Sequence, residues 1–111
     1  MKELKTAIKE FIRERDWEQY HDPKNLAMAL TVEASEILEI FQWQHSGANL
    51  SPAEQQALAE EIGDVFIYLL ELADKFSIDV IEAAHQKLEI NKQKYPADQV
   101  RGQAKKYTEY P

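Results

Sequence analysis

Two acidic but otherwise apolar segments constrain this chain more than any other feature of its sequence. They cover residues 30–44 and 59–72, and each contains two carboxylates three residues apart: Glu33 and Glu36 in the first, Glu61 and Asp64 in the second. Residues with this spacing lie on one face of a helix. Four carboxylates on two facing helices repel one another unless a cation lies between them, and oxygen ligands suit hard ions such as Mg²⁺ or Mn²⁺. The pattern predicts a metal site between two helices.

A simpler interpretation stays open from these residues alone. An acidic pair with this spacing is common on ordinary solvated helices, because short motifs have little specificity. Both pairs lie in apolar segments and at matching helical phase, which places the metal interpretation level with the solvated one. Glu39 and Glu71 flank the pairs, and we expect them to be solvated or to support the metal ligands from outside.

Helical periodicity continues along most of the chain, and no segment alternates as a strand would. We expect four helices, over residues 2–16, 24–44, 52–74 and 77–94 or 79–94. Asp22-Pro23 and the capping box that starts at Ser51 indicate where the second and third helices begin. Tyr95-Pro96 should end the fourth. The sequence predicts an all-α fold in a single domain, residues 1–111, with a polar tail over residues 97–111 that has no regular structure.

Composition narrows the partners and the location. The net charge is -7, from 20 acidic and 13 basic residues, which argues against general nucleic-acid binding. There is no cysteine, which excludes disulfides and thiolate metal sites. No apolar run reaches membrane-spanning length and no signal-peptide core is present, so we expect a cytoplasmic protein with no membrane partner. The second and third helices are too apolar for one small subunit to cover, which predicts a homo-oligomer, a homotetramer in preference to a dimer.

An aromatic residue follows each acidic pair. Trp43 lies seven residues after Glu36, and Tyr68 lies seven residues after Glu61. Positions seven apart differ by only about 20° around a helix, so each ring should lie two turns from a carboxylate on nearly the same side. A metal beside a flat aromatic surface suits a phosphorylated ligand with a planar base. Taken alone, rings at such positions are more often core residues than base-stacking ones.

The motifs together resemble a known enzyme family. Besides the two acidic pairs, the similarity rests on these segments: Asp16-Trp17-Glu18-Gln19-Tyr20-His21 with Pro23 and Asn25-Leu26, Phe41-Gln42-Trp43, Glu60-Glu61-Ile62-Gly63-Asp64-Val65 with Ile67-Tyr68-Leu69, Ile90-Asn91 with Lys94-Tyr95-Pro96, and Lys106-Tyr107-Thr108-Glu109. They resemble the MazG-like all-α nucleoside triphosphate pyrophosphohydrolases, and within them the dCTP pyrophosphatase branch. The similarity covers nearly the whole chain, from about Phe11 to Pro111.

The resemblance implies hydrolysis of a nucleoside triphosphate to the monophosphate and pyrophosphate. It implies that four residues bind Mg²⁺: Glu33, Glu36, Glu61 and Asp64. Trp17 and Trp43 would help to form a base pocket, and four residues would contact the nucleotide: Tyr68, Asn91, Lys94 and Tyr95. The animal dCTP enzymes also carry a histidine in the first helix near the base. Residues 6–10 contain none, so strict cytosine preference is not implied.

Our functional hypothesis is a Mg²⁺-dependent pyrophosphohydrolase acting on dCTP or a related, modified deoxynucleoside triphosphate. A role in clearing surplus or modified nucleotides rests on the resemblance alone. One carboxylate should accept the proton of the attacking water; Glu36 is our first choice, with Glu33 and Glu61 close behind. The alternatives are the same chemistry on dUTP or a broad range of triphosphates, and a non-enzymatic helical interaction module. A di-iron protein is more distant, because Glu82-x-x-His85 lacks a second such pair.

Overall fold

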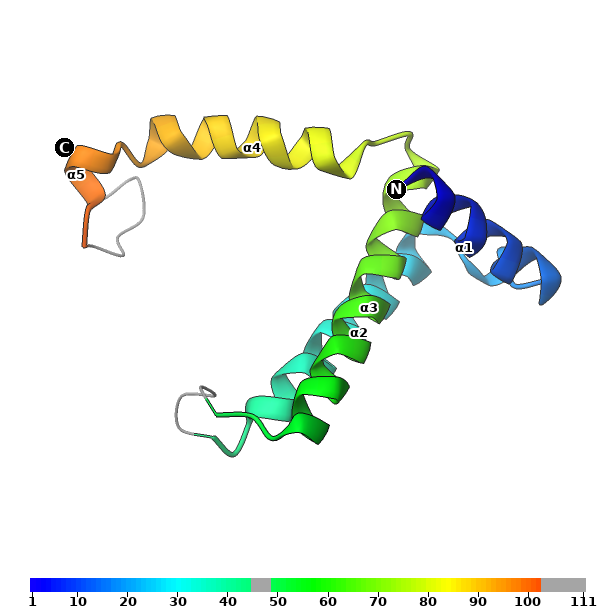
Figure 1. Ribbon diagram of the computed structural model, residues 1–111. Helices are drawn as coiled ribbons and strands as arrows, with labels where there is room; N and C mark the ends of the chain where they lie inside the picture. The colour runs from blue at the N-terminus through cyan, green and yellow to red at the C-terminus, as the bar shows by residue number, and fades with distance from the viewer. Residues whose placement is uncertain (45–48, 103–111) are drawn as a thin grey trace. The chain divides into compact units, whose positions relative to one another are not determined.

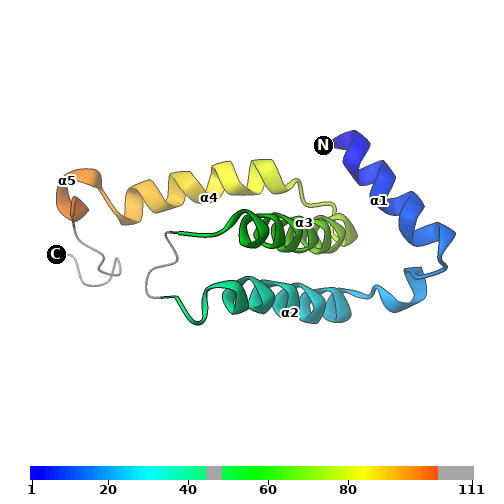
Figure 2. The same ribbon diagram turned by 60° about the horizontal axis from the view of Figure 1, so that its bottom comes forward.

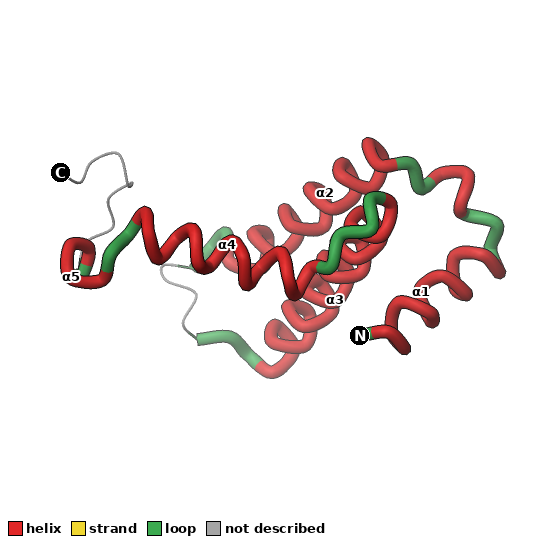
Figure 3. The backbone as a smooth tube through the Cα atoms, turned by 90° about the horizontal axis from the view of Figure 1, so that it is seen from above, coloured by secondary structure: helices red, strands yellow, loops and turns green. Residues whose placement is uncertain are grey.

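The computed structural model of the chain describes residues 1–44 and 49–102. It divides into two compact units, Met1–Ser77 and Ile78–Pro111, which are described separately below. The first unit contains four elements: α1 (Lys2–Glu14), the 3₁₀ helix η1 (Glu18–Tyr20), α2 (Pro23–Phe41) and α3 (Pro52–Lys75) (Figure 1). The second contains α4 (Val80–Lys94) and the short α5 (Ala97–Val100). Every regular element in the described ranges is a helix (Figure 3), which confirms the predicted all-α class.

The helices begin where local sequence signals predict. The Asp22 carboxylate accepts a hydrogen bond of 2.8 Å from the backbone N–H of Asn25, which caps α2. At the start of α3, Ser51 and Glu54 form the predicted capping box, with reciprocal hydrogen bonds of 3.1 and 2.9 Å. Asp79 accepts two N–H bonds from the first turn of α4. These side chains satisfy backbone donors that have no partner within the helix.

The helices depart from the predictions at the ends of α1 and α2 and in the tail, and α1 ends at Glu14 instead of residue 16. We predicted that the second helix would continue to Gln44, but α2 ends at Phe41. The tail was expected to lack regular structure, but it contains α5, in which the backbone N–H groups of Gln99 and Val100 bond to the carbonyl of Pro96 at 2.9 and 3.1 Å. Pro96 is the N-cap of α5, where its own N–H would take no part in the helix, so the missing N–H of proline costs nothing there. The tail motif at residues 106–109 lies outside the described residues.

The core of the first unit lies at one end of a helix pair. α2 and α3 lie side by side and antiparallel (Figure 2). α1 reaches the C-terminal end of α3, where Lys9 and Asp74 form an ion pair of 3.2 Å. Among the described residues, the buried apolar side chains gather here: Ile8, Ile12, Leu26, Leu70 and Ala73. The acidic pairs lie further along α2 and α3, where the side chains are less deeply buried.

Large apolar side chains remain exposed on the described helices. Leu38 on α2 is 68% exposed and Ile62 on α3 is 52% exposed, and Met28 and Val32 are exposed to a similar degree. This agrees with the apolar character noted in the sequence. None of the described helices is both long and apolar enough to span a membrane.

Candidate metal and nucleotide site

The two acidic pairs meet between α2 and α3. Glu33 from α2 and two residues of α3, Glu61 and Asp64, each offer a carboxylate oxygen within 4.8 Å of the others. Glu36 also belongs to this cluster, because its carboxyl group interacts with those of Glu33 and Glu61. The antiparallel helices bring the pairs together because each pair occupies one face of its own helix. The four carboxyl groups therefore lie close together in the structure, as the spacing of the two pairs predicted.

Like charges dominate the electrostatics of this acidic cluster. The pKa of Glu61 is raised to about 7, first by its hydrogen bond with Glu36, then by burial and by Glu33. The pKa of Glu33 is also raised, chiefly by burial, with Glu36 adding to the effect. Two ionised carboxylates cannot donate to each other, so a short contact between them requires a proton. Without a cation, the cluster relieves part of its repulsion by holding protons.

The residues of this cluster fit a hard divalent cation. Oε2 of Glu33 and Oε2 of Glu61 are both buried, and neither has a hydrogen-bond partner in the described part of the chain. Buried carboxylate oxygens without partners are costly and usually signal a missing ligand or ion. The donor set is entirely oxygen, which suits Mg²⁺ or Mn²⁺ better than softer metals. Metal ligation would satisfy both unpartnered oxygens.

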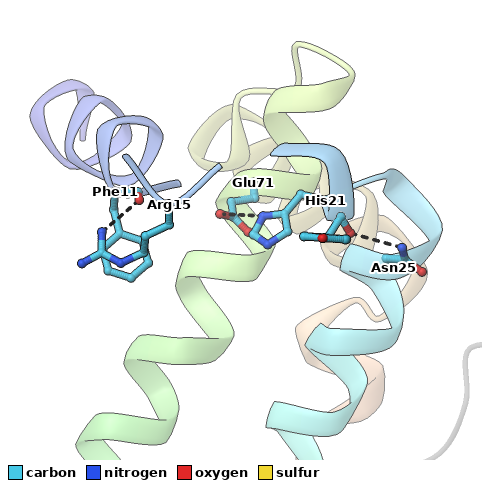
Figure 4. A network of polar contacts seen from close by, with 6 residues as sticks. Phe11, Arg15, His21, Asn25 and Glu71 are labelled. Atoms are coloured by element: carbon cyan, nitrogen blue, oxygen red, sulfur yellow. Dashed lines mark hydrogen bonds and ion pairs between the residues drawn. The ribbon is translucent and has the colours of Figure 1, made fainter. Parts of the chain in front are cut away.

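A cavity of about 400 Å³ adjoins the cluster within the first unit. Asp64 forms part of its wall, so the cavity and the acidic cluster share a residue. Aromatic rings form much of the rest: Phe11, Trp17 and Tyr68. The rings of Phe11 and Trp17 meet edge to face with centroids 5.7 Å apart. The Arg15 guanidinium lies 3.8 Å from the centre of the Phe11 ring (Figure 4). Trp17 and Tyr68, both predicted to contact a nucleotide, therefore line one aromatic cavity.

A buried histidine–carboxylate pair also lines this cavity. His21 comes from the segment before α2 and Glu71 from α3 (Figure 4). Nδ1 of His21 lies 3.4 Å from Oε1 of Glu71, and the two side chains are only 18% and 7% exposed. Burial raises the pKa of Glu71, and the charge of His21 acts in the opposite direction. The expectation that Glu71 is solvated is wrong. Its spacing of seven residues from Asp64 places it on nearly the same side of the helix, but Asp64 is itself exposed, so no local signal indicated the burial of Glu71.

Four other residues were predicted to contact the nucleotide. Trp43 follows the end of α2 and is 90% exposed, so the expectation that it extends the helical face of Glu36 is wrong. Asn91 and Lys94 belong to α4, and Tyr95 caps its C-terminus by donating its backbone N–H to the Asn91 carbonyl at 2.8 Å. These three lie in the second unit, half-buried. Nucleotide binding by these four residues stays a prediction.

Comparison with known proteins decides the family. The profile of the MazG-like family matches residues 28–110, which include the whole acidic cluster. The chain belongs to the MazG-like family. Two curated relatives of this MazG-like chain are named dCTP pyrophosphatase 1, from Homo sapiens (43% identical) and Mus musculus (42%). Each similarity extends over 100% of this chain and 68% of the relative.

Solved structures agree with this assignment. The crystal structure of a pyrophosphatase from Archaeoglobus fulgidus DSM 4304 is 43% identical to this MazG-like chain, with a TM-score of 0.75. The match covers 86% of this chain and 92% of that one. The family resemblance predicted from the motifs, including the dCTP pyrophosphatase branch, is therefore confirmed.

Proposed function

We propose that this MazG-like chain is a nucleotide pyrophosphohydrolase that converts dCTP or a related, possibly modified, deoxynucleoside triphosphate to the monophosphate and pyrophosphate. One observation carries the proposal: an acidic cluster with unpartnered buried oxygens adjoins an aromatic cavity and shares Asp64 with it. The names of the relatives, dCTP pyrophosphatase 1 and pyrophosphatase, support the same chemistry. The carboxylates suit the metal that a triphosphate requires, and the rings suit a base.

Four residues would hold Mg²⁺, or Mn²⁺ in its place: Glu33, Glu36, Glu61 and Asp64. When bound, the cation supplies neutralisation of phosphate charge and orients the pyrophosphate leaving group. In the reaction, a water oxygen bonds to the α-phosphorus, the bond from that phosphorus to the bridging oxygen breaks, and the water gives up a proton. We assign the acceptance of that proton to Glu36, with Glu33 and Glu61 as alternatives.

The aromatic residues of the cavity would hold the base. Trp17 and Tyr68 offer flat surfaces for stacking, and the cavity has the size of an ordinary small-molecule site. We keep Trp43, Asn91, Lys94 and Tyr95 as further nucleotide contacts on the resemblance alone. Phosphates at the acidic cluster and a base against these rings would place the whole nucleotide along one groove.

The remaining proposals concern the whole protein. We propose that residues 1–111 act as a single MazG-like domain and that the chain forms a homotetramer, with a dimer as the alternative. The exposed apolar residues of α2 and α3 support self-association. We also propose a cytoplasmic location with no nucleic-acid or membrane partner, which the net charge of -7 supports for nucleic acids.

The deciding experiment measures pyrophosphate release from canonical and 5-modified nucleoside triphosphates, with Mg²⁺ and with EDTA. We expect release only with the metal, and a loss of at least about 100-fold in Glu33→Gln and Asp64→Asn, because a metal ligand should matter more than the outer-shell residues that typically change affinity 10–100-fold. Glu39→Gln, an exposed carboxylate beside the cluster, is the matched control and should keep its activity.

Thermal unfolding separates this enzyme from an interaction module. A ligand that binds only the folded state raises the unfolding midpoint. Mg²⁺ should therefore stabilise the wild-type protein and the Glu39→Gln control, but not the Glu33→Gln or Asp64→Asn protein. If the folded protein releases no pyrophosphate from any nucleotide and Mg²⁺ leaves its midpoint unchanged, the enzyme proposal fails and the interaction module takes its place.

A further inference from the structure

Glu71 is a buried carboxylate to which the proposed chemistry gives no role. Its side chain is 7% exposed, and its Oε1 lies 3.4 Å from Nδ1 of His21, while the charge of Lys75 also acts on the carboxyl group. The other oxygen, Oε2, is buried without a hydrogen-bond partner among the described residues. The neighbouring residues of α3 at this point, Leu70 and Ala73, are apolar and buried. An apolar side chain here would pack at lower cost than a half-satisfied carboxylate.

The position of Glu71 relates it to the nucleotide site. It lies two helical turns beyond Asp64 on nearly the same side of α3, about 10 Å along the axis. Both residues line the cavity that contains the rings of Trp17 and Tyr68. The His21 ring lies 6.4 Å from the Tyr68 ring, centre to centre, so the His21–Glu71 pair adjoins the aromatic surface. With phosphates at Asp64, the base would extend along the cavity towards Glu71.

We infer that Glu71, held beside His21, determines base specificity by accepting a hydrogen bond from an amino group of the base, and so selects cytosine-type bases over uracil or thymine. This inference rests on the proposed function. An ionised carboxylate only accepts hydrogen bonds. The 4-amino group of cytosine donates one to such a carboxylate, whereas the 4-oxo group of uracil is another acceptor and would oppose it.

The size of the effect follows from burial. A site built to bond a polar group of its substrate rejects an analogue that leaves its own buried polar atoms unpaired. Oε2 of Glu71 is such an atom, because it has lost its contact with water and has gained no partner in the described structure. At position 4 of the ring, the oxo group of uracil would leave this oxygen unpaired, while the amino group of cytosine would satisfy it. A discrimination of at least about 10-fold is expected from one good contact of this kind.

The test compares dCTP with dUTP, which differ only at the edge of the ring that Glu71 would contact. We expect the wild-type protein to have at least about 10-fold higher kcat/KM for dCTP. In Glu71→Gln the amide can either donate or accept, so the ratio should fall at least about 10-fold towards equality. Glu39→Gln makes the same substitution at an exposed carboxylate and should keep the wild-type ratio. A merely structural role would change the unfolding midpoint but not the ratio.

A binding measurement keeps this inference separate from the proposed activity. Calorimetry with dCMP and dUMP, in EDTA, should show the same preference for the amino base in the wild-type protein and its loss in Glu71→Gln. If the enzyme turns over both triphosphates but a folded Glu71→Gln protein keeps the wild-type ratio, the inference is overturned while the function stands. If no triphosphate is hydrolysed, the function fails and the two monophosphates decide the inference. Equal binding of dCMP and dUMP by the wild-type protein overturns it in every case.

Discussion

Two carboxyl groups of this protein have raised pKa values for different physical reasons. Glu61 owes its value of about 7 mainly to the neighbouring carboxyl groups, with Glu36 first among them. Glu71 owes its raised pKa mainly to burial, and its neighbour His21 works against the shift. A cation bound in the acidic cluster would take the place of the protons there and so lower the pKa of Glu61. It would leave the burial that raises the pKa of Glu71 unchanged. The raised pKa of Glu61 thus follows from its acidic neighbours, and that of Glu71 from its buried position.

The acidic cluster should make metal-free stability depend on pH. The pKa of Glu61 is about 7 in the folded protein against an ordinary value of 4.5. Between these values the folded state keeps a proton that the unfolded state has lost, so this contribution to stability falls as the pH rises and is gone above about 7. Urea unfolding in EDTA at pH 5, 6, 7 and 8 measures it. Replacing the titrating group, in Glu61→Gln, should flatten the pH dependence.

Two controls belong to this pH experiment. The raised pKa values of Glu33 and Glu71 act in the same direction, so Glu61→Gln should reduce the slope without abolishing it. Adding Mg²⁺ at pH 8 should restore the stability of the wild-type protein, because the cation replaces the lost protons. A Glu61→Gln protein with the same pH slope as the wild type would show that the cluster does not hold its protons at Glu61.

Sequence patterns predicted some of these residues and missed others. The acidic cluster was predictable because the i, i+3 spacing fixes the face of each helix, and two such faces with matching phase can meet. The burial of Glu71 was not predicted, because it depends on His21, which is 50 residues earlier in the chain. The exposure of Trp43 was missed because the phase argument holds only while the helix continues, and α2 ends two residues before it.

At the scale of the helices, starts were easier to predict than ends. Asp22, Ser51 and Asp79 are N-caps in the structure; the first two were expected from their side chains, and Asp79 was one of two alternatives, with Ser77. A side chain that accepts N–H bonds is a local and specific signal. The end of α2 has no glycine or proline to mark it, since Gln42 is its C-cap. Its position is therefore set by interactions that local sequence does not encode.

The capping box of α3 should contribute measurably to stability. Ser51→Ala removes the hydroxyl that accepts the Glu54 N–H bond, and the loss of such a cap costs roughly 1 kcal/mol. For a chain of this size that corresponds to a fall of about 4 °C in the unfolding midpoint. Thermal unfolding followed by circular dichroism measures the change. α3 also carries Glu61 and Asp64, so its first turn supports the helix that presents half of the acidic cluster.

Ser35→Ala is the matched control for this cap. Ser35 lies inside α2, where its hydroxyl donates to the Val32 carbonyl at 2.6 Å and caps nothing. Alanine is the better helix former at an exposed interior position, so this variant should be as stable as the wild type or slightly more so. Equal losses in both variants would mean that the Ser51 hydroxyl has no special role at the start of α3.

At the scale of the whole molecule, the described residues include fewer buried apolar side chains than exposed large apolar ones. The described core consists of five residues near one end of the α2–α3 pair, two of them leucines. Elsewhere on these helices, Met28, Val32, Leu38 and Ile62 are more than half exposed. Fully burying one such side chain typically stabilises a protein by about 1.5–3 kcal/mol. Self-association is the means by which a small chain can gain this stabilisation.

A charge placed among these exposed residues should therefore dissociate the proposed homotetramer. Leu38 is the most exposed of the four, at 68%, and Leu38→Lys would put an unpaired charge into a subunit interface that covered it. Light scattering after size-exclusion chromatography should show a tetramer for the wild type and a smaller species, with a lower unfolding midpoint, for the variant. Gln56→Lys introduces the same charge at an exposed polar position of α3 and should remain tetrameric. A wild-type protein that is monomeric would contradict self-association altogether. A tetramer that Leu38→Lys leaves intact would mean that the interface lies on another face, and Ile62→Lys is the corresponding test of that face.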